Sequence, residues 1–150
     1  MNHRRELLTL MYKLGEVSST ETALFHQVAA SKVGLGVTEM KTLSVLLQEG
    51  PASAGQIAAR LNLTSGAVTG IIDRLVRKEF VSRRPDPKDR RKIIVVLNRQ
   101  KLQLQNTAYH SMGAAFTELL EKYSTEELEF LVRYYQATIE LTKQEIAKLS

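Results

Sequence analysis

The sequence predicts a mainly α-helical protein, in which a helix-turn-helix and a small β-hairpin are flanked by longer helices at both ends. Three observations lead to this fold class. Apolar residues recur with a helical period over most of the 150 residues. Between residues 80 and 97 the period changes to two, and β-branched residues become frequent. From residue 128 to residue 149, apolar residues alternate at spacings of four and three, as in helices that pack lengthwise on one another.

The composition is that of a globular protein rather than a membrane protein. Apolar residues make up 43% and charged residues 25% of the chain. No apolar run approaches the ~18 residues of a membrane span, and no cleavage site for a signal peptide follows the basic start. There is no cysteine, which excludes disulfide bonds and thiolate metal sites. We therefore expect a cytoplasmic protein with no metal, no cofactor and no membrane partner.

Positive charge is concentrated in the middle of the chain. The segment from Arg60 to Lys101 contains 12 Lys/Arg and 4 Asp/Glu, a balance of +8, whereas the remainder has a balance of −3. Such segregation suits a surface that binds a polyanion, because each neutralised phosphate releases condensed counterions. A basic face that is merely solvated is the alternative.

Three helices are expected before residue 63. Residues 4–30 form a long amphipathic helix that ends before two glycines. Thr38 is expected to cap a second helix that Gly50 terminates, and Ser53 to cap a third. The apolar stripe of the second helix consists of Met40, Leu43, Leu46 and Leu47, and that of the third of Ile57, Ala58 and Leu61.

A fourth helix is expected to begin at Thr64, whose hydroxyl can cap free amide groups. With the third helix and the short turn between them, it forms a helix-turn-helix. One face of the fourth helix is apolar and carries Val68, Ile71, Ile72, Leu75 and Val76. The opposite face is first small and then basic and carries Ser65, Gly66, Thr69, Gly70, Asp73, Arg74 and Arg77. Because small side chains let a helix approach phosphates closely, we expect this face to lie in a groove of DNA.

Two strands joined by a charged turn follow this helix. Residues 80–84 alternate in character, and residues 93–97 form a β-branched run. The connection from Pro85 to Asp89 contains two prolines and two aspartates, which favour a stiff turn. We therefore expect a hairpin with a charged tip, the wing of a winged helix.

Helical periodicity returns in residues 99–123, and Ser124 with Glu127 forms the capping box of a last helix. The apolar seam of this last helix can pack on the first helix of the same chain or on a second subunit. Because apolar helices lie at both ends of a basic central unit, we favour an intertwined homodimer. The seam consists of Leu128, Val132, Tyr135, Ile139, Thr142, Ile146 and Leu149.

The central segment contains four motifs: Leu61-x-Leu63-Thr64, Val68-Thr69-x-Ile71-Ile72-Asp73-Arg74-Leu75, Val81-x-Arg83 and Asp86-Pro87-x-Asp89-Arg90-Arg91. In this combination the segment resembles the MarR family of bacterial transcription regulators. The resemblance implies a winged helix-turn-helix homodimer that binds a palindromic operator, usually as a repressor relieved by a small ligand. It divides the chain into an N-terminal dimerisation helix (1–36), a DNA-binding unit (37–98) and C-terminal dimerisation helices (99–150).

The resemblance also implies roles for individual residues. The residues that it assigns to the major groove and the nearby phosphates are Ser65, Gly66, Thr69, Gly70, Arg74 and Arg77. In the wing, Asp89 would steady the turn while Arg90 and Arg91 reach the minor groove, whose negative potential suits a guanidinium. Lys88 is expected either to contact phosphates or to remain a surface charge. Glu79 departs from the family, which usually has glycine at that turn.

Other functions have less support in the sequence. Motifs such as G-x-S-x-G and H-E-x-x-H are absent, so we expect no enzyme. A non-specific architectural DNA-binding protein is the alternative to a regulator, because two glycines in the fourth helix leave few long side chains to reach bases. A set of residues on the flanking helices has two interpretations; it consists of Tyr12, Phe25, His26, Tyr109 and Met112. These residues could line a crevice for a small aromatic effector, but we favour ordinary core packing.

Overall fold

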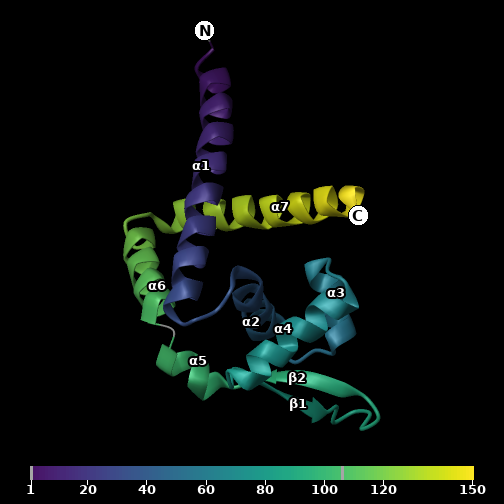
Figure 1. Cartoon of the computed structure of the whole chain (residues 1–150). Coiled ribbons are helices and arrows are strands. Elements are labelled where there is room, and N and C mark those ends of the chain that lie inside the picture. Colours follow the sequence, from purple (N-terminus) through teal and green to yellow (C-terminus); the bar gives the residue numbers. More distant parts are fainter. Residues whose placement is uncertain (1, 106) are drawn as a thin grey trace. The chain divides into compact units, whose positions relative to one another are not determined.

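A computed structural model gives the structure of the protein for residues 2–105 and 107–150. The chain forms two compact units, the first ending at Gln105 and the second comprising the rest. The first unit contains α1 (His3–Lys32), α2 (Val37–Glu49), α3 (Ala54–Leu61), α4 (Ser65–Arg77), β1 (Val81–Pro85), β2 (Ile93–Leu97) and α5 (Arg99–Gln105) (Figure 1). The second unit contains α6 (Thr107–Leu120) and α7 (Thr125–Leu149). The mainly α-helical winged helix-turn-helix fold expected from the sequence is confirmed.

The hydrophobic core of the first unit lies where α2, α3 and α4 meet the hairpin. Each of these elements turns one apolar face toward the others, which removes that face from water. The expected stripe of α4 is buried at four positions, and its fifth member, Val76, is half-buried. The most completely enclosed apolar side chains are Leu43, Leu46, Ile57, Val68, Ile72, Leu75 and Val95.

The buried face of α2 differs from the expected stripe. Leu47 is 45% exposed, whereas Glu39 and Thr42 are buried. The Thr42 hydroxyl donates to the carbonyl oxygen of Thr38 at 2.8 Å, so its burial leaves no donor unsatisfied. The inward face of α2 is set by its packing against α3, α4 and β2 rather than by the apolar character of its residues alone.

Side-chain caps begin α3 and α4 as expected. Thr64 Oγ1 accepts a hydrogen bond from the amide of Ala67 at 3.2 Å, and Ser53 forms a capping box at the start of α3. The expected cap at Thr38 is wrong. Gly36 occupies the cap position with an extended backbone, so α2 begins before Thr38 and no side chain caps it.

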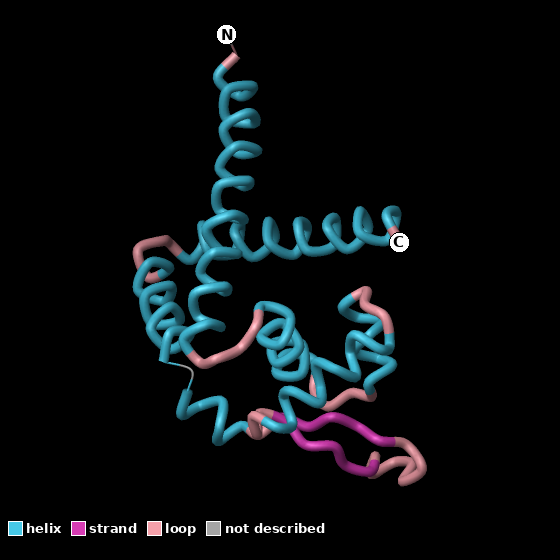
Figure 2. The backbone as a smooth tube through the Cα atoms, viewed as in Figure 1, coloured by secondary structure: helices cyan, strands magenta, loops and turns pink. Residues whose placement is uncertain are grey.

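The wing is an antiparallel hairpin, whose β1 and β2 pair in register from Val81 with Leu97 at the base toward the tip (Figure 2). A bridge to the segment between α2 and α3 holds the middle of β2. There the amide of Val95 donates to the carbonyl oxygen of Ala52 at 2.7 Å. The hairpin is therefore anchored as far as the middle of its strands, and its turn lies at the free end.

The turn between α4 and β1 contains Glu79, whose φ of 64° lies in the left-handed region. A residue other than glycine in that region costs on the order of 1–2 kcal/mol. Asn98 supports the turn through two hydrogen bonds. Its side-chain amide donates to the carbonyl oxygen of Glu79 at 3.1 Å, and its backbone amide donates to the carbonyl oxygen of Phe80 at 2.8 Å. These two bonds hold the turn in a conformation that glycine adopts more readily than other residues.

The second unit consists of two helices whose side chains are exposed or half-buried. The helix expected over residues 99–123 is present as α5 and α6, on either side of residue 106, which lies outside the described part of the chain. The capping box of Ser124 with Glu127 is confirmed at the start of α7. Along α7, Val132, Ile139 and Ile146 are each more than half exposed.

The apolar residues of α1 are also largely uncovered. In this 30-residue helix, only Ala29 and Ala30 are buried. Among the described residues, no helix combines the length and the apolar character that a membrane span requires. The exposed apolar residues of α1 include Leu7, Leu10, Met11, Leu14, Val17, Leu24 and Val28.

Candidate nucleic-acid interface

The outer face of α4 carries small side chains in its first half. Ser65, Gly66 and Thr69 are exposed, and Gly70 is half-buried. The Thr69 hydroxyl donates to the backbone carbonyl oxygen of Ser65 at 2.9 Å. A Cβ atom at Gly66 would have no neighbour within 4 Å, and one at Gly70 would meet only the guanidinium of Arg74 at 3.5 Å. No described part of the chain therefore requires glycine at these two positions.

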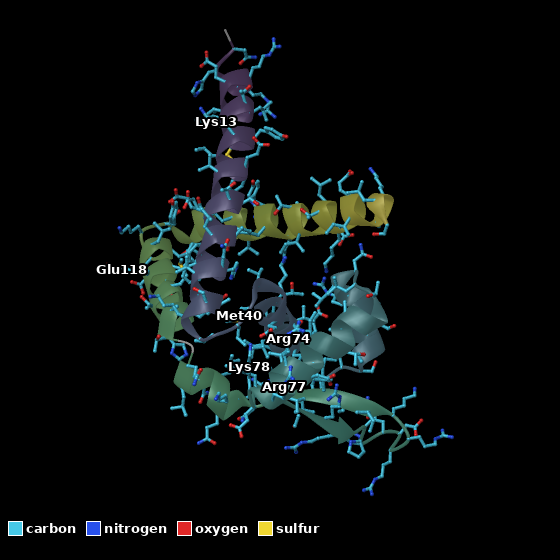
Figure 3. All side chains as sticks on the ribbon, viewed as in Figure 1. Lys13, Met40, Arg74, Arg77, Lys78 and Glu118 are labelled. Carbon is cyan, nitrogen blue, oxygen red and sulfur yellow. The ribbon has the colours of Figure 1, made fainter. Side chains whose placement is uncertain are left out.

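A buried carboxylate holds the other end of α4. Glu39 on α2 is 6% exposed, and its two oxygens accept from Arg74 Nε and Lys78 Nζ, each at 2.9 Å. Lys78 also donates to the carbonyl oxygen of Gly34 at 2.8 Å. Figure 3 shows Arg74, Arg77 and Lys78 together at this end of the helix. We refer to Glu39, Arg74 and Lys78 as the Glu39 cluster.

The Glu39 cluster keeps its carboxylate ionised. Burial alone would raise the pKa of Glu39, but hydrogen bonds from Lys78 and Arg74 and their positive charges outweigh burial and hold that pKa below its usual value. Arg74 uses its Nε in this contact and still exposes 46% of its side chain. No pattern in the sequence points to Glu39, because its partners lie 35 and 39 residues away in the sequence.

An ion pair joins α4 to the wing. Nη2 of Arg83 on β1 donates to Oδ1 of Asp73 on the outer face of α4. Both side chains are about half exposed, so the pair lies at the surface. It neutralises the one acidic group on the outer face of α4 and bridges this helix and β1. The motif positions of Asp73 and Arg83 were noted in the sequence, but their contact was not predicted.

The tip of the wing is organised by its two aspartates. Asp86 Oδ1 accepts from the amide of Lys88 at 2.9 Å. Asp89 Oδ1 accepts from the amide of Arg91 at 3.2 Å and from its Nε at 3.1 Å. These bonds from the Arg91 side chain and backbone hold the pKa of Asp89 below its usual value. The Arg91 side chain remains 91% exposed, and Lys88 and Arg90 are exposed beside it.

The residues of the candidate effector crevice are divided between the two units. Tyr12, Phe25 and His26 lie on α1, and Tyr109 and Met112 lie on α6. The rings of Phe25 and His26 contact each other edge to face, with centroids 5.8 Å apart. Partial burial raises the pKa of Tyr109. The crevice as a binding site stays a prediction.

One open cavity of about 720 Å³ lies in the first unit, beside the turn between α4 and β1. Its lining includes Glu79, Arg84 and Asn98, and none of the residues proposed for the effector crevice. No group of three or more potential metal ligands occurs among residues 2–105 and 107–150.

Comparisons with known proteins agree with this geometry. The model of the MarR family matches residues 35–93, which extend from the loop before α2 into β2. The uncharacterized HTH-type transcriptional regulator YcgE of Bacillus subtilis is 32% identical over 149 residues, covering 99% of this chain and 96% of that protein. The HTH-type transcriptional repressor YetL of Bacillus subtilis is 28% identical over 128 residues, covering 84% of this chain and 76% of its own length.

Among solved structures, a MarR family protein from Bacillus stearothermophilus has a similar fold. Its TM-score is 0.72 at 18% sequence identity, and the alignment covers 95% of this chain and 99% of that chain. At this level of identity the comparison supports the fold of the whole chain.

Proposed function

Because the chain belongs to the MarR family of DNA-binding transcriptional regulators, we propose that it is a repressor that binds a near-palindromic operator as a homodimer. One observation carries the proposal for the DNA-binding surface. The Arg83–Asp73 ion pair joins the exposed face of α4 and the wing into a single unit. The two elements that we propose to contact DNA therefore lie beside each other, and both carry exposed cations.

We assign the parts of this surface to the two grooves of DNA. The first half of α4 enters the major groove, because its small outer side chains permit a close approach. Arg90 and Arg91 at the exposed wing tip contact the minor groove, and Lys88 contacts phosphates. At the far end of α4, the phosphate contacts come from Arg77 and from the free terminal nitrogens of Arg74. The major-groove residues are Ser65, Gly66, Thr69 and Gly70.

The homodimer is supported by apolar residues that the single chain leaves uncovered. Nine large apolar residues of α1 are exposed, and so is the seam of α7 apart from the half-buried Leu128. Exposed apolar surface of this extent is unfavourable in water and usually marks an interface. A second copy of the chain is the partner that we propose, with residues 1–36 and 99–150 forming the dimerisation part.

We propose two further details of the function: that the protein represses transcription, and that a small aromatic effector relieves this repression. A similar protein, YetL, bears the name of a transcriptional repressor. For the effector crevice we propose Tyr12, Phe25, His26, Tyr109 and Met112. We also propose that the protein is located in the cytoplasm. A panel of phenolic acids that raises the melting temperature of the wild-type protein, but not that of Tyr109→Ala, would support the crevice.

Footprinting on the promoter next to the protein's own gene tests the proposed function. We expect protection of two half-sites about one helical turn apart, related by two-fold symmetry. A footprint without this symmetry would contradict the homodimer. The affinity for the protected site and for competitor DNA, measured at one stated salt concentration, separates the repressor from an architectural protein. Equal affinities would favour the architectural alternative, to which Gly66 and Gly70 lend support.

A further inference from the structure

We infer that Thr69 selects thymine in each half-site, through contact between its γ-methyl group and the 5-methyl group of the base. The inference rests on the proposed function, in which the outer face of α4 enters the major groove. The family supplies the duplex as the ligand, and the structure indicates which chemical group of the helix meets a base edge.

The hydroxyl of Thr69 is engaged inside the helix. An exposed threonine offers a base a hydroxyl group and a methyl group. Here Oγ1 donates its only proton to the carbonyl oxygen of Ser65 at 2.9 Å. Donation to a base would break that bond, whereas a contact of the methyl group requires no rearrangement. The hydroxyl oxygen can still accept from a base amino group, but the methyl group is the part of this side chain that no hydrogen bond within the helix uses.

The neighbours of Thr69 leave few other side chains on this face. Gly66, Thr69, Gly70 and Asp73 share one face of α4, at positions i, i+3, i+4 and i+7. The two glycines have no side chain, and no described residue fills the space beside Gly66. The carboxylate of Asp73, one turn further along, already accepts from Arg83. Ser65, one turn before Thr69, is also exposed, so that of these two side chains Thr69 is the one that offers a base pair a methyl group.

A methyl group distinguishes thymine from the other bases in the major groove. Thymine alone carries a 5-methyl group there, and apolar contact with it is an established mode of base recognition. Removing one methyl group from such a contact changes affinity by about fourfold, and by about 16-fold when both half-sites of a dimer are altered. This effect is large enough to measure and small enough to leave binding intact.

The test uses a duplex that wild-type protein selects from a randomised pool. Each thymine of one half-site is replaced in turn by deoxyuridine, which removes only the 5-methyl group. Affinities are measured by fluorescence anisotropy at one salt concentration for wild type, Thr69→Ser and Thr69→Val. Serine keeps the hydroxyl and removes the methyl group, whereas valine keeps a methyl group at that position and removes the hydroxyl.

We expect one thymine per half-site at which deoxyuridine weakens wild-type binding about fourfold. At that position the substitution should leave Thr69→Ser unaffected and should weaken Thr69→Val as it weakens wild type. An equal loss for wild type and Thr69→Ser would assign the effect to DNA shape and overturn the inference. The inference would also be overturned if no deoxyuridine substitution weakened binding of the wild-type protein. This result cannot be attributed to a misfolded variant, because it is measured on the wild type alone. If the proposed function itself is wrong, the result is different: the wild-type protein then enriches no duplex from the randomised pool.

Discussion

Arg74 Nε donates to Glu39 Oε1 at 2.9 Å, and this contact joins the end of α4 to α2. The carboxylate is buried, whereas the guanidinium is 46% exposed. The contact therefore leaves Arg74 two roles, one as an internal support of α4 and one as a cation available to a phosphate.

Glu39→Gln is expected to lower the free energy of unfolding by about 1–2 kcal/mol, since it removes the charge from two charge-assisted hydrogen bonds. The loss is smaller than for a fully buried pair, because Arg74 and Lys78 can be solvated when their partner is removed. The matched control is Glu49→Gln, which removes a carboxylate whose pair with Arg60 is half exposed on both sides. Its expected effect is below about 0.5 kcal/mol. Equal losses in urea titrations of the two variants would contradict the special role of the buried carboxylate.

The stability of the protein should depend on pH through Glu39. Its pKa in the folded state is below the usual value of 4.5, so the unfolded chain binds a proton more readily than the folded chain. The contribution of Glu39 is therefore present above pH 4.5 and is lost as the pH falls through its folded pKa. Urea titrations of wild type and Glu39→Gln at several pH values should give unfolding free energies that converge in acid. A constant difference between the two proteins would contradict this assignment.

The parts of the fold that depend on neighbours in the sequence could be predicted. The cap at Thr64 and the capping box at Ser53 involve residues three positions apart, and the wing follows from a change of period. The family resemblance drawn from the motifs is likewise confirmed. Thr38 was assigned wrongly because a glycine with extended backbone can begin a helix without a side-chain cap.

The parts of the site that depend on packing between helices could not be predicted. Periodicity assigned Leu47 to the core and gave no reason to bury Glu39, since a carboxylate on an amphipathic helix is usually at the surface. The partners of Glu39 and Asp73 lie on other elements, and their contacts require the crossing of α2, α4 and β1 in space. The hydrogen bond of the Thr69 hydroxyl joins residues only four positions apart. The sequence nevertheless does not tell whether the hydroxyl or the methyl group of Thr69 is free of contacts within the helix.

Arg91→Ala is expected to weaken operator binding by about 1–3 kcal/mol. The side chain is 91% exposed at the wing tip, so its loss should leave the melting temperature unchanged. If Arg91 of each subunit neutralises one phosphate, the slope of log K against log salt concentration should also become less steep by about 0.9 per subunit, or about 1.8 for the dimer. Lys143→Ala removes an exposed charge from α7 and should change neither quantity. Identical anisotropy titrations for Arg91→Ala and wild type would count against the wing assignment.

Gly66→Ala should change stability and DNA binding in opposite directions. Alanine in a helix is more favourable than glycine by about 0.5–1 kcal/mol, and an added Cβ at this position meets no described atom within 4 Å. The melting temperature should therefore rise, while the added methyl group holds the helix away from the bases and weakens operator binding. Gly55→Ala is the control, because Gly55 has the same position in α3 as Gly66 in α4 and an added Cβ there would meet only the Ser53 hydroxyl, at 4.0 Å. It should raise the melting temperature and leave operator affinity unchanged. Tighter binding by Gly66→Ala would refute a close approach of α4 to the duplex.

The proposed homodimer predicts that one charged substitution in the seam of α7 disperses the subunits. Ile139 is 53% exposed in the single chain and lies in the middle of the seam. Placing aspartate there would bury an unpaired carboxylate in the interface, which costs more than the loss of apolar contact alone. Ala147→Asp adds the same charge on the polar side of the same helix, beside Lys143 and Gln144, where water can solvate it. Sedimentation equilibrium should therefore give a monomer for Ile139→Asp and a dimer for Ala147→Asp and wild type. Because a monomer covers only one half-site, Ile139→Asp should also lose the two-fold footprint, whereas a dimer that persists in this variant would show that the subunits meet elsewhere.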